Sequence, residues 1–137
     1  MRTFLDSSGL AKRYIRERGS EKVEEVLAGA SEVAVSLIAP PEIISALCRL
    51  RREKAISAAQ YGLAKKSLFA DIEVMSICTI TVPVVGKTID LLEKHPLRTL
   101  DALHLACAIE WMADLFVSSD RRQTSAALKS GLRVVQV

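Results

Sequence analysis

Short apolar segments alternate with helix-forming segments along the chain, and this alternation limits the fold more than any other feature. Five segments are expected to be strands, at residues 2–5, 32–37, 76–80, 114–118 and 133–137. Helices are expected between them, at residues 8–18, 21–28, 40–54, 58–70, 84–94, 97–112 and 121–129. Strands that alternate with helices of about 10–15 residues form parallel sheets through right-handed crossovers. We therefore predict a three-layer α/β/α sandwich around a central, mostly parallel sheet of four to five strands.

The composition is typical of a soluble globular domain. The chain has 137 residues, half of them apolar and about a quarter charged, so we expect one domain over residues 1–137 with a sizeable core. No apolar run approaches the roughly 18–20 residues of a membrane span, and Asp6 falls where a signal peptide would be apolar. The three cysteines are far apart and have apolar neighbours, which predicts free thiols and a cytoplasmic location.

Residues 97–112, LRTLDALHLACAIEWM, are expected to form a buried helix. Apolar residues fall on nearly all of its sides, as in a helix surrounded by protein. Thr99 stands where its hydroxyl would cap the helix, and Asp101 lies in the first turn. A buried, unpaired carboxylate is unfavourable, so Asp101 either interacts with the helix end or faces a positive group.

Three further acids belong to the same edge of the predicted sheet as Asp101. Asp6 ends the first strand and Asp120 ends the fourth, while Glu42 lies in the first turn of a helix opened by Pro40-Pro41. In a parallel α/β sheet, the carboxyl ends of the strands and the amino ends of the following helices share one edge, and ligands bind in the crevice there. We therefore expect the four acidic side chains to converge on one functional site.

Four converging carboxylates need protons or a cation between them. Oxygen ligands suit Mg²⁺ or Mn²⁺, which commonly bridge a few carboxylates to a substrate phosphate. One or two such ions can activate a water and stabilise the leaving oxygen of a phosphodiester. The sequence supplies the acids and has no glycine-rich phosphate loop, which favours metal-dependent phosphodiester hydrolysis.

The charge balance agrees with a polyanionic substrate. With four of the 16 acids set aside as metal ligands, 12 remain against 19 basic residues. A surface that is positive in this way suits nucleic acid. The candidate phosphate contacts near the predicted edge are Lys12, Arg13, Arg49, Arg98, Arg121 and Arg122.

Four segments carry a resemblance to a known family, namely FLDSSGLAKRY, PPEIISALCRLRR, LRTLDALHLACAIE and LFVSSDRRQTSAALKSGLRVV. Together they cover nearly the whole chain, and they resemble the PIN-domain ribonucleases, especially the VapC-type toxins of toxin–antitoxin pairs. The resemblance implies an endoribonuclease that depends on Mg²⁺ or Mn²⁺. The metal-binding and catalytic acids that it implies are Asp6, Glu42, Asp101 and Asp120. Ser8 and Ser118 stand where the family often has a hydroxyl that supports the acids or the ions.

The same resemblance implies a cytoplasmic homodimer, an RNA substrate and a cognate antitoxin that blocks the acidic cleft. This chain departs from the family in small ways. Serine stands at positions 7 and 118 where the family often has threonine, and both keep the hydroxyl. The Pro40-Pro41 pair before Glu42 is less usual and would tilt the start of that helix.

Two other classes of function stay open. An aspartyl-phosphate enzyme would need a second acid beside Asp6, where the sequence has Ser7-Ser8-Gly9, and a lysine after a later strand. The alternative to a nuclease is a non-catalytic module that binds RNA or a protein partner. Four clustered negative charges facing phosphates argue against such a module.

The remaining candidate residues have structural interpretations. His104, one helical turn after Asp101, is expected to be a hydrogen-bonded core histidine and not a metal ligand or general base. Trp111 and Met112 are expected in the core or at a dimer interface. The helix over residues 58–70 either packs inside the monomer or contacts a partner chain.

Overall fold

The computed structural model describes residues 1–137, and its centre is one five-stranded parallel sheet. The strands are β1 (Arg2–Leu5), β2 (Glu32–Ser36), β3 (Ser76–Cys78), β4 (Leu115–Ser118) and β5 (Arg133–Gln136). Their order across the sheet is β3-β2-β1-β4-β5, and every neighbouring pair is parallel. The predicted α/β/α architecture is confirmed, with all five strands parallel.

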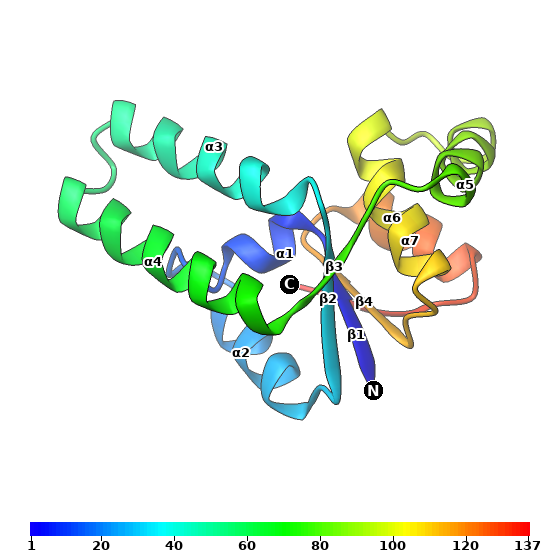
Figure 1. Cartoon of the computed structure of the whole chain (residues 1–137), viewed down its shortest axis with the longest axis horizontal. Helices are drawn as coiled ribbons and strands as arrows, with labels where there is room; N and C mark the ends of the chain where they lie inside the picture. The colour runs from blue at the N-terminus through cyan, green and yellow to red at the C-terminus, as the bar shows by residue number, and fades with distance from the viewer.

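Seven helices cover the two faces of this sheet. They are α1 (Ser7–Ala11), α2 (Ser20–Gly29), α3 (Ala39–Arg52), α4 (Ala58–Val74), α5 (Val82–Lys94), α6 (Thr99–Glu110) and α7 (Arg121–Lys129). Helices α1–α4 lie on one face and α5–α7 on the other, with α3 and α4 forming a long hairpin (Figure 1). None of the helices combines the length and the apolar character that crossing a membrane requires.

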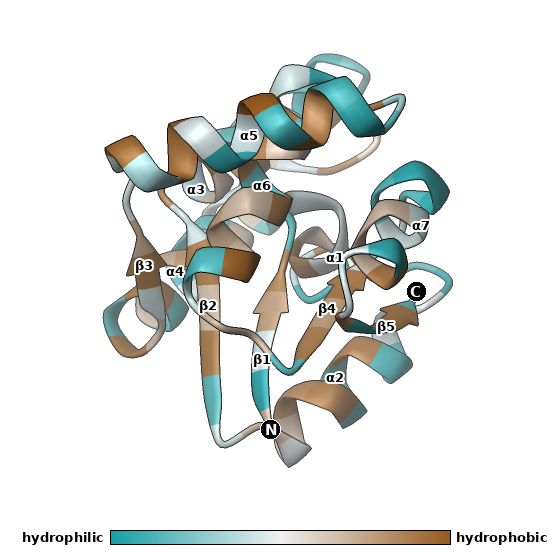
Figure 2. Ribbon diagram, turned by 90° about the vertical axis from the view of Figure 1, so that its right-hand side faces the viewer, coloured by the Kyte–Doolittle hydropathy of each residue, from teal (hydrophilic) through white to brown (hydrophobic).

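Each central strand sends alternate side chains to the two faces, which produces two separate hydrophobic cores. Phe4 and Phe116 pack with α5–α7, and their rings stack with centroids 6.1 Å apart. Leu5 and Val117, the next residues in sequence, pack with α1–α4. The central strands are hydrophobic along most of their length (Figure 2), because helices cover both faces of a parallel sheet.

The strand order changes direction between β1 and β4. From β1 the chain builds outward through β2 to β3, and it then crosses the sheet to continue at β4. The carboxyl ends of β1 and β4 therefore border a crevice at a topological switch point, where sheets of this kind bind ligands. Asp6 follows β1 and Asp120 follows β4 at this crevice.

Gly9 allows α1 to begin directly against β4. A Cβ atom at this position would stand 2.8 Å from the backbone oxygen of Val117 and 3.3 Å from Oδ1 of Asp6. Only a residue without a side chain fits so close an approach between a helix and a strand. The first turn of α1 is thus fixed relative to β4.

The helix predicted over residues 8–18 is wrong in its length, because α1 has only five residues. Nζ of Lys12 donates to the backbone carbonyl of Arg18 at 2.7 Å, and the guanidinium of Arg13 pairs with Asp71 on α4. The chain turns after α1, and the pair of Arg13 with Asp71 ties this turn to α4.

The first turn of α6 also differs from the prediction. The helix spans Thr99–Glu110, and its N-cap residue is Arg98, whose side chain makes no capping hydrogen bond. The expected cap at Thr99 is therefore wrong, since Thr99 is already helical. Asp101 supplies the negative charge in this first turn, where the helix dipole favours it.

The cysteines and Trp111 behave as predicted. All three cysteines are free thiols. Trp111 packs against the ring of Phe4, and the guanidinium of Arg2 lies 4.2 Å from its ring centroid. Met112, by contrast, is 70% exposed, so it does not belong to the core.

Exposed apolar side chains occur on α4 and α5. One side of α4 packs inside the monomer through Ala64 and Leu68, whereas other side chains of the helix are exposed. The large exposed apolar residues of the two helices are Leu63, Phe69, Val74, Val82, Val85 and Ile89. Exposed apolar surface of this kind is common where proteins contact one another.

Candidate active site

The four predicted acids lie around one pocket at the crevice between β1 and β4. The pocket has a volume of about 420 Å³, and its lining includes Asp6, Glu42, Asp101 and Asp120. Asp6 and Glu42 belong to the starts of α1 and α3, on one face of the sheet. Asp101 and Asp120 belong to the starts of α6 and α7, on the other face. The structure thus brings together acids from four segments and from both helical layers.

Asp6 is buried and is held by short hydrogen bonds. Ser8 Oγ donates to its carboxylate at 2.8 Å, and Ser118 Oγ donates to Oδ2 at 2.7 Å. The amide of Gly9 donates to Oδ1 at 2.8 Å, which caps α1. Burial raises the pKa of Asp6 above its ordinary value, although the bonds from Ser118, Gly9 and Ser8 act in the opposite direction. Ser8 and Ser118 therefore both orient this acid.

Glu42 is held through one carboxylate oxygen. Oε1 accepts a hydrogen bond from Ser7 Oγ at 2.7 Å and lies 2.5 Å from Nε2 of His104. Burial acts to raise the pKa of Glu42, but the bonds from His104 and Ser7 outweigh it, and the pKa is lowered. His104 is the hydrogen-bonded core histidine that the sequence predicts, and its partner is one of the four acids.

Asp101 lies among the negative charges of the other three acids. Gln123 Nε2 donates to its Oδ1 at 3.1 Å. Burial raises the pKa of Asp101, and the negative charges of Asp120, Asp6 and Glu42 raise it further. These like charges show that the acids lie close enough to repel one another.

Asp120 is the N-cap residue of α7. Its Oδ1 accepts the amide of Arg122 at 2.8 Å, and its own amide donates to Ser118 Oγ at 3.0 Å. Asp120 thus caps a helix, which is the ordinary role of an acid at this position, and it also lines the pocket.

The donor set fits a hard divalent cation. Glu42, Asp101 and Asp120 each keep one carboxylate oxygen that takes part in no hydrogen bond. No three acidic, histidine or cysteine side chains are already gathered into a ligand cage. Mg²⁺ retains several of its own waters and needs only one or two carboxylates, so open donors suit it. The buried Oε1 of Gln123, which has no partner, is an acceptor suited to such a water.

The predicted basic contacts separate into three groups. Arg49 lines the acidic pocket. Lys12 and Arg121 line a cavity of about 460 Å³ that has no acidic residue in its lining. The basic side chains of that cavity are Lys12, Arg18, Lys22 and Arg121. Arg98 and Arg122 are exposed at the starts of α6 and α7 and line neither of these cavities.

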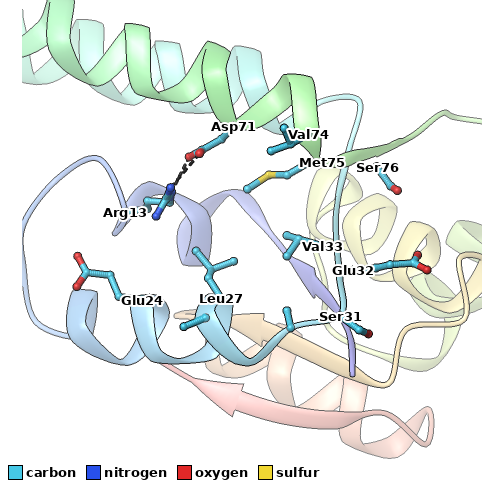
Figure 3. A pocket seen from close by; sticks show the side chains of 12 residues that line it. Arg13, Glu24, Leu27, Ser31, Glu32, Val33, Asp71, Val74, Met75 and Ser76 are labelled. Carbon is cyan, nitrogen blue, oxygen red and sulfur yellow. Dashed lines mark hydrogen bonds and ion pairs between the residues drawn. The ribbon is translucent and has the colours of Figure 1, made fainter.

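Arg13 was predicted near the acids but lies at another cavity. That cavity, of about 570 Å³, is bordered by α2, β2 and α4 and contains none of the four acids (Figure 3). At its edge, the Arg13 guanidinium donates to Asp71 at 2.5 Å and 2.9 Å. Arg13 therefore pairs with Asp71 at this other cavity and is not a contact of the acidic pocket.

Several contacts of the site were not predicted from the sequence. Ser7 and Gln123 bind Glu42 and Asp101 respectively, and Ser36 binds His104. The sequence did offer a signal for Gln123. It follows Asp120 by three residues, which places it in the first turn of α7, at the same end of the helix as that acid. No lysine lines the acidic pocket, and the acid neighbouring Asp6 that an aspartyl-phosphate enzyme needs is a serine.

The parallel sheet and the carboxylates around its switch point define the class, an α/β protein with an acidic ligand pocket. A family model described as the PIN domain matches residues 3–129. The chain belongs to the PIN-domain family, and the resemblance stated from its motifs is confirmed.

Proteins similar to this chain include a ribonuclease and chains of solved toxin structures. Ribonuclease VapC46 of Mycobacterium tuberculosis is 28% identical over 134 residues, which cover 96% of this chain and 95% of that protein. A toxin–antitoxin complex from Klebsiella pneumoniae contains a similar chain, with a TM-score of 0.71, 15% identity and coverage of 98% and 96%. VapC20 of Mycobacterium tuberculosis, described as a toxin that cleaves the sarcin–ricin loop, has a TM-score of 0.69, 16% identity and coverage of 90% and 94%. The two structural likenesses support the fold.

Proposed function

We propose that this chain is a metal-dependent endoribonuclease that hydrolyses RNA phosphodiester bonds as the toxin of a toxin–antitoxin pair. The observation that carries the proposal is the convergence of four acids on one pocket in a PIN-family chain. The names of two similar proteins support it, since VapC46 is called a ribonuclease and VapC20 a toxin that cleaves the sarcin–ricin loop.

The acids Asp6, Glu42, Asp101 and Asp120 would hold one or two Mg²⁺ or Mn²⁺ ions. When bound, such an ion supplies the positive charge that activates a water and neutralises the leaving oxygen of the phosphodiester. The protein holds the four carboxylates near one another, and the pKa of Asp101 is raised first by its burial and further by the charges of Asp120, Asp6 and Glu42. Ser8 and Ser118 keep Asp6 in one orientation, and Gln123 does the same for Asp101.

Basic side chains beside the acids are suited to the phosphates that flank the cleaved bond. We assign this role to Arg49 in the acidic pocket and to Arg121 in the neighbouring cavity. Lys12 lines that cavity too, but its ammonium pairs with Glu17 and donates to the carbonyl of Arg18. Arg121 follows Asp120 directly in sequence, so an RNA strand bound at the acids would pass close to Arg121. Cationic contacts of this kind give affinity without reading bases.

Two protein partners complete the proposal. One is a cognate antitoxin that covers the acidic cleft, and the other is a second copy of this chain in a homodimer. The solved toxin–antitoxin complex with a similar chain supports the first, and the exposed apolar residues of α4 and α5 support the presence of partner chains. We place the protein in the cytoplasm, where its three thiols stay reduced.

Cleavage of a mixed RNA pool tests the proposal. The purified protein is incubated with Mg²⁺, with Mn²⁺ and with EDTA, and the Asp101→Asn variant is treated in the same way. Cutting that requires the metal and is lost in the variant supports the nuclease. If wild-type protein and variant both leave the pool intact but bind RNA equally, the non-catalytic RNA-binding module is the correct function.

A further inference from the structure

A chain of hydrogen bonds runs from the interior of the sheet to the acidic pocket through His104. Ser36, the last residue of β2, has its Oγ 2.8 Å from Nδ1 of His104. On the other side of the ring, Nε2 lies 2.5 Å from Oε1 of Glu42. Ser36 is fully buried and His104 is 1% exposed, so neither side chain can exchange its partner for water.

The chemistry of the partners determines the direction of these bonds. An ionised carboxylate only accepts, so Nε2 of His104 must carry the hydrogen that Glu42 receives. In a neutral imidazole, Nδ1 is then an acceptor, and the hydroxyl of Ser36 donates to it. A buried serine thus selects the tautomer that gives Glu42 a donor.

The position of His104 connects three acid-bearing segments. It lies on α6, one turn after Asp101, and it contacts Glu42 of α3. Ser7, directly after Asp6, donates to the same Oε1 of Glu42 at 2.7 Å and lies 3.2 Å from Nε2 of His104. Both donors act on one oxygen, which leaves Oε2 of Glu42 without a hydrogen bond.

We propose that His104 is a positioning residue that fixes the orientation of the Glu42 carboxylate, and that Ser36 holds His104 in the tautomer this requires. The inference rests on the proposed function, because it assumes that Oε2 of Glu42 is used as a metal ligand. Groups that orient metal ligands in this way typically affect metal affinity by about 10–100-fold.

The tautomer is tested without metal or RNA. Two-bond ¹H–¹⁵N spectra of the metal-free protein near pH 8 report which ring nitrogens carry a hydrogen, and His95, the second of the two histidines, provides an internal comparison. A hydrogen on Nε2 of His104 and none on Nδ1 supports the inference. A hydrogen on Nδ1 overturns it, whatever the protein does to RNA.

Variants test the effect on the metal site. His104→Gln retains an amide N–H at the position of Nε2, whereas His104→Asn places its amide at the position of Nδ1 and loses the donor to Glu42. In folded His104→Asn we expect Mn²⁺ binding, measured by titration calorimetry, to weaken about 10–100-fold. We expect kcat to fall in parallel and KM for RNA to stay within about twofold. His104→Gln should restore both quantities to within about fivefold of wild type.

Ser36→Ala keeps the histidine and removes only the hydroxyl that fixes its tautomer, so we expect a smaller loss of Mn²⁺ affinity, about 3–10-fold. Thr88→Val is the matched control, because Thr88 is also buried and its hydroxyl donates within α5 at 2.8 Å. Wild-type Mn²⁺ affinity and kcat in folded His104→Asn would overturn the inference, as would equal losses in Ser36→Ala and Thr88→Val. If wild-type protein neither binds Mn²⁺ nor cleaves RNA, the proposed function fails and this role for His104 fails with it.

Discussion

Ser118 Oγ donates to Oδ2 of Asp6 at 2.7 Å and joins the ends of two neighbouring strands that are 112 residues apart in the sequence. The same hydroxyl oxygen accepts the amide of Asp120 at 3.0 Å. One buried side chain therefore orients an acid after β1 and the backbone of an acid after β4. Ser118 thus has hydrogen bonds to two of the four acids.

Ser118→Ala should weaken the site without unfolding the protein. Asp6 keeps the bonds from Ser8 and Gly9, so the free energy of unfolding should fall by about 1.5–3 kcal/mol, the effect of one buried hydrogen bond to a charged group. Mn²⁺ affinity should fall about 10-fold. Calorimetric titration and thermal unfolding measure the two effects. Ser130→Ala, which removes a hydroxyl bonded within α7, should leave Mn²⁺ affinity unchanged.

Gly9→Ala should destabilise the fold and reduce cleavage together. The added Cβ would stand 2.8 Å from the carbonyl oxygen of Val117, so α1 must move away from β4. Overpacking of this kind costs about 1–3 kcal/mol. Chemical denaturation measures the loss. Gly86→Ala on α5, where a Cβ meets nothing within 4 Å, should instead add up to about 1 kcal/mol through helix propensity. A neutral Gly9→Ala would contradict the close approach.

Asp101→Asn should raise stability in EDTA. Burial and the charges of Asp120, Asp6 and Glu42 raise the pKa of Asp101, so the ionised form is disfavoured in the folded protein near pH 7. A neutral amide removes this repulsion, and thermal unfolding in EDTA should occur at the same temperature as wild type or higher. Added Mn²⁺ should stabilise wild type more than the variant. A variant that unfolds at lower temperature in EDTA would show that Asp101 has a structural role.

Acid should remove the stability that Asp71 contributes. Burial acts to raise its pKa, but Arg13 and Tyr14 outweigh burial and lower it. The folded pKa therefore lies below the unfolded value of about 3.9, so the stabilisation is complete above that pH and is lost as the pH falls through the folded pKa. Asp71→Asn should cost about 1–2 kcal/mol at pH 7.

Unfolding measured between pH 7 and pH 2 checks this dependence. The difference between wild type and Asp71→Asn should shrink toward zero at the acid end. Asp90→Asn, at an exposed position of α5 with no ion pair, should differ little from wild type at any pH. A difference between wild type and Asp71→Asn that stays constant to pH 2 would exclude the ionised carboxylate as its source.

Arg121→Ala should weaken RNA binding in a salt-dependent manner. The measurement uses an Asp101→Asn background, which prevents cleavage. The slope of log Kobs against log salt is negative, and its magnitude should fall by about 1. Fluorescence anisotropy at several salt concentrations measures it. Arg133→Ala removes an exposed cation at the start of β5, on the opposite edge of the sheet, and should leave the slope as it is.

The convergence of the four acids could be predicted because it depends on backbone topology alone. Parallel strands end on one edge, so Asp6 and Asp120 had to meet the first turns that hold Glu42 and Asp101. The motif resemblance indicated the same four residues. Their surroundings were predicted only in part, through Ser8 and Ser118.

The other contacts depend on side-chain reach across the sheet. Ser36 and His104 are 68 residues apart, and no periodicity in the sequence reports that they touch. The length of α1 was wrong for a similar reason, because the sequence does not report the pair of Arg13 with Asp71, 58 residues away on α4. Local patterns describe helix faces, whereas these contacts are set by packing between elements.

The acids are divided between two helical layers, with Asp6 and Glu42 on one and Asp101 and Asp120 on the other. Each layer has its own hydrophobic core, and the sheet separates the two cores. An ion bound among the acids would therefore add a second link between the layers, beside the hydrogen bond of His104 on α6 with Glu42 on α3. By thermodynamic linkage, it would stabilise the folded chain by RT ln(1 + [ion]/Kd). The cooperativity with which the two helical layers unfold would then depend on the concentration of free cation.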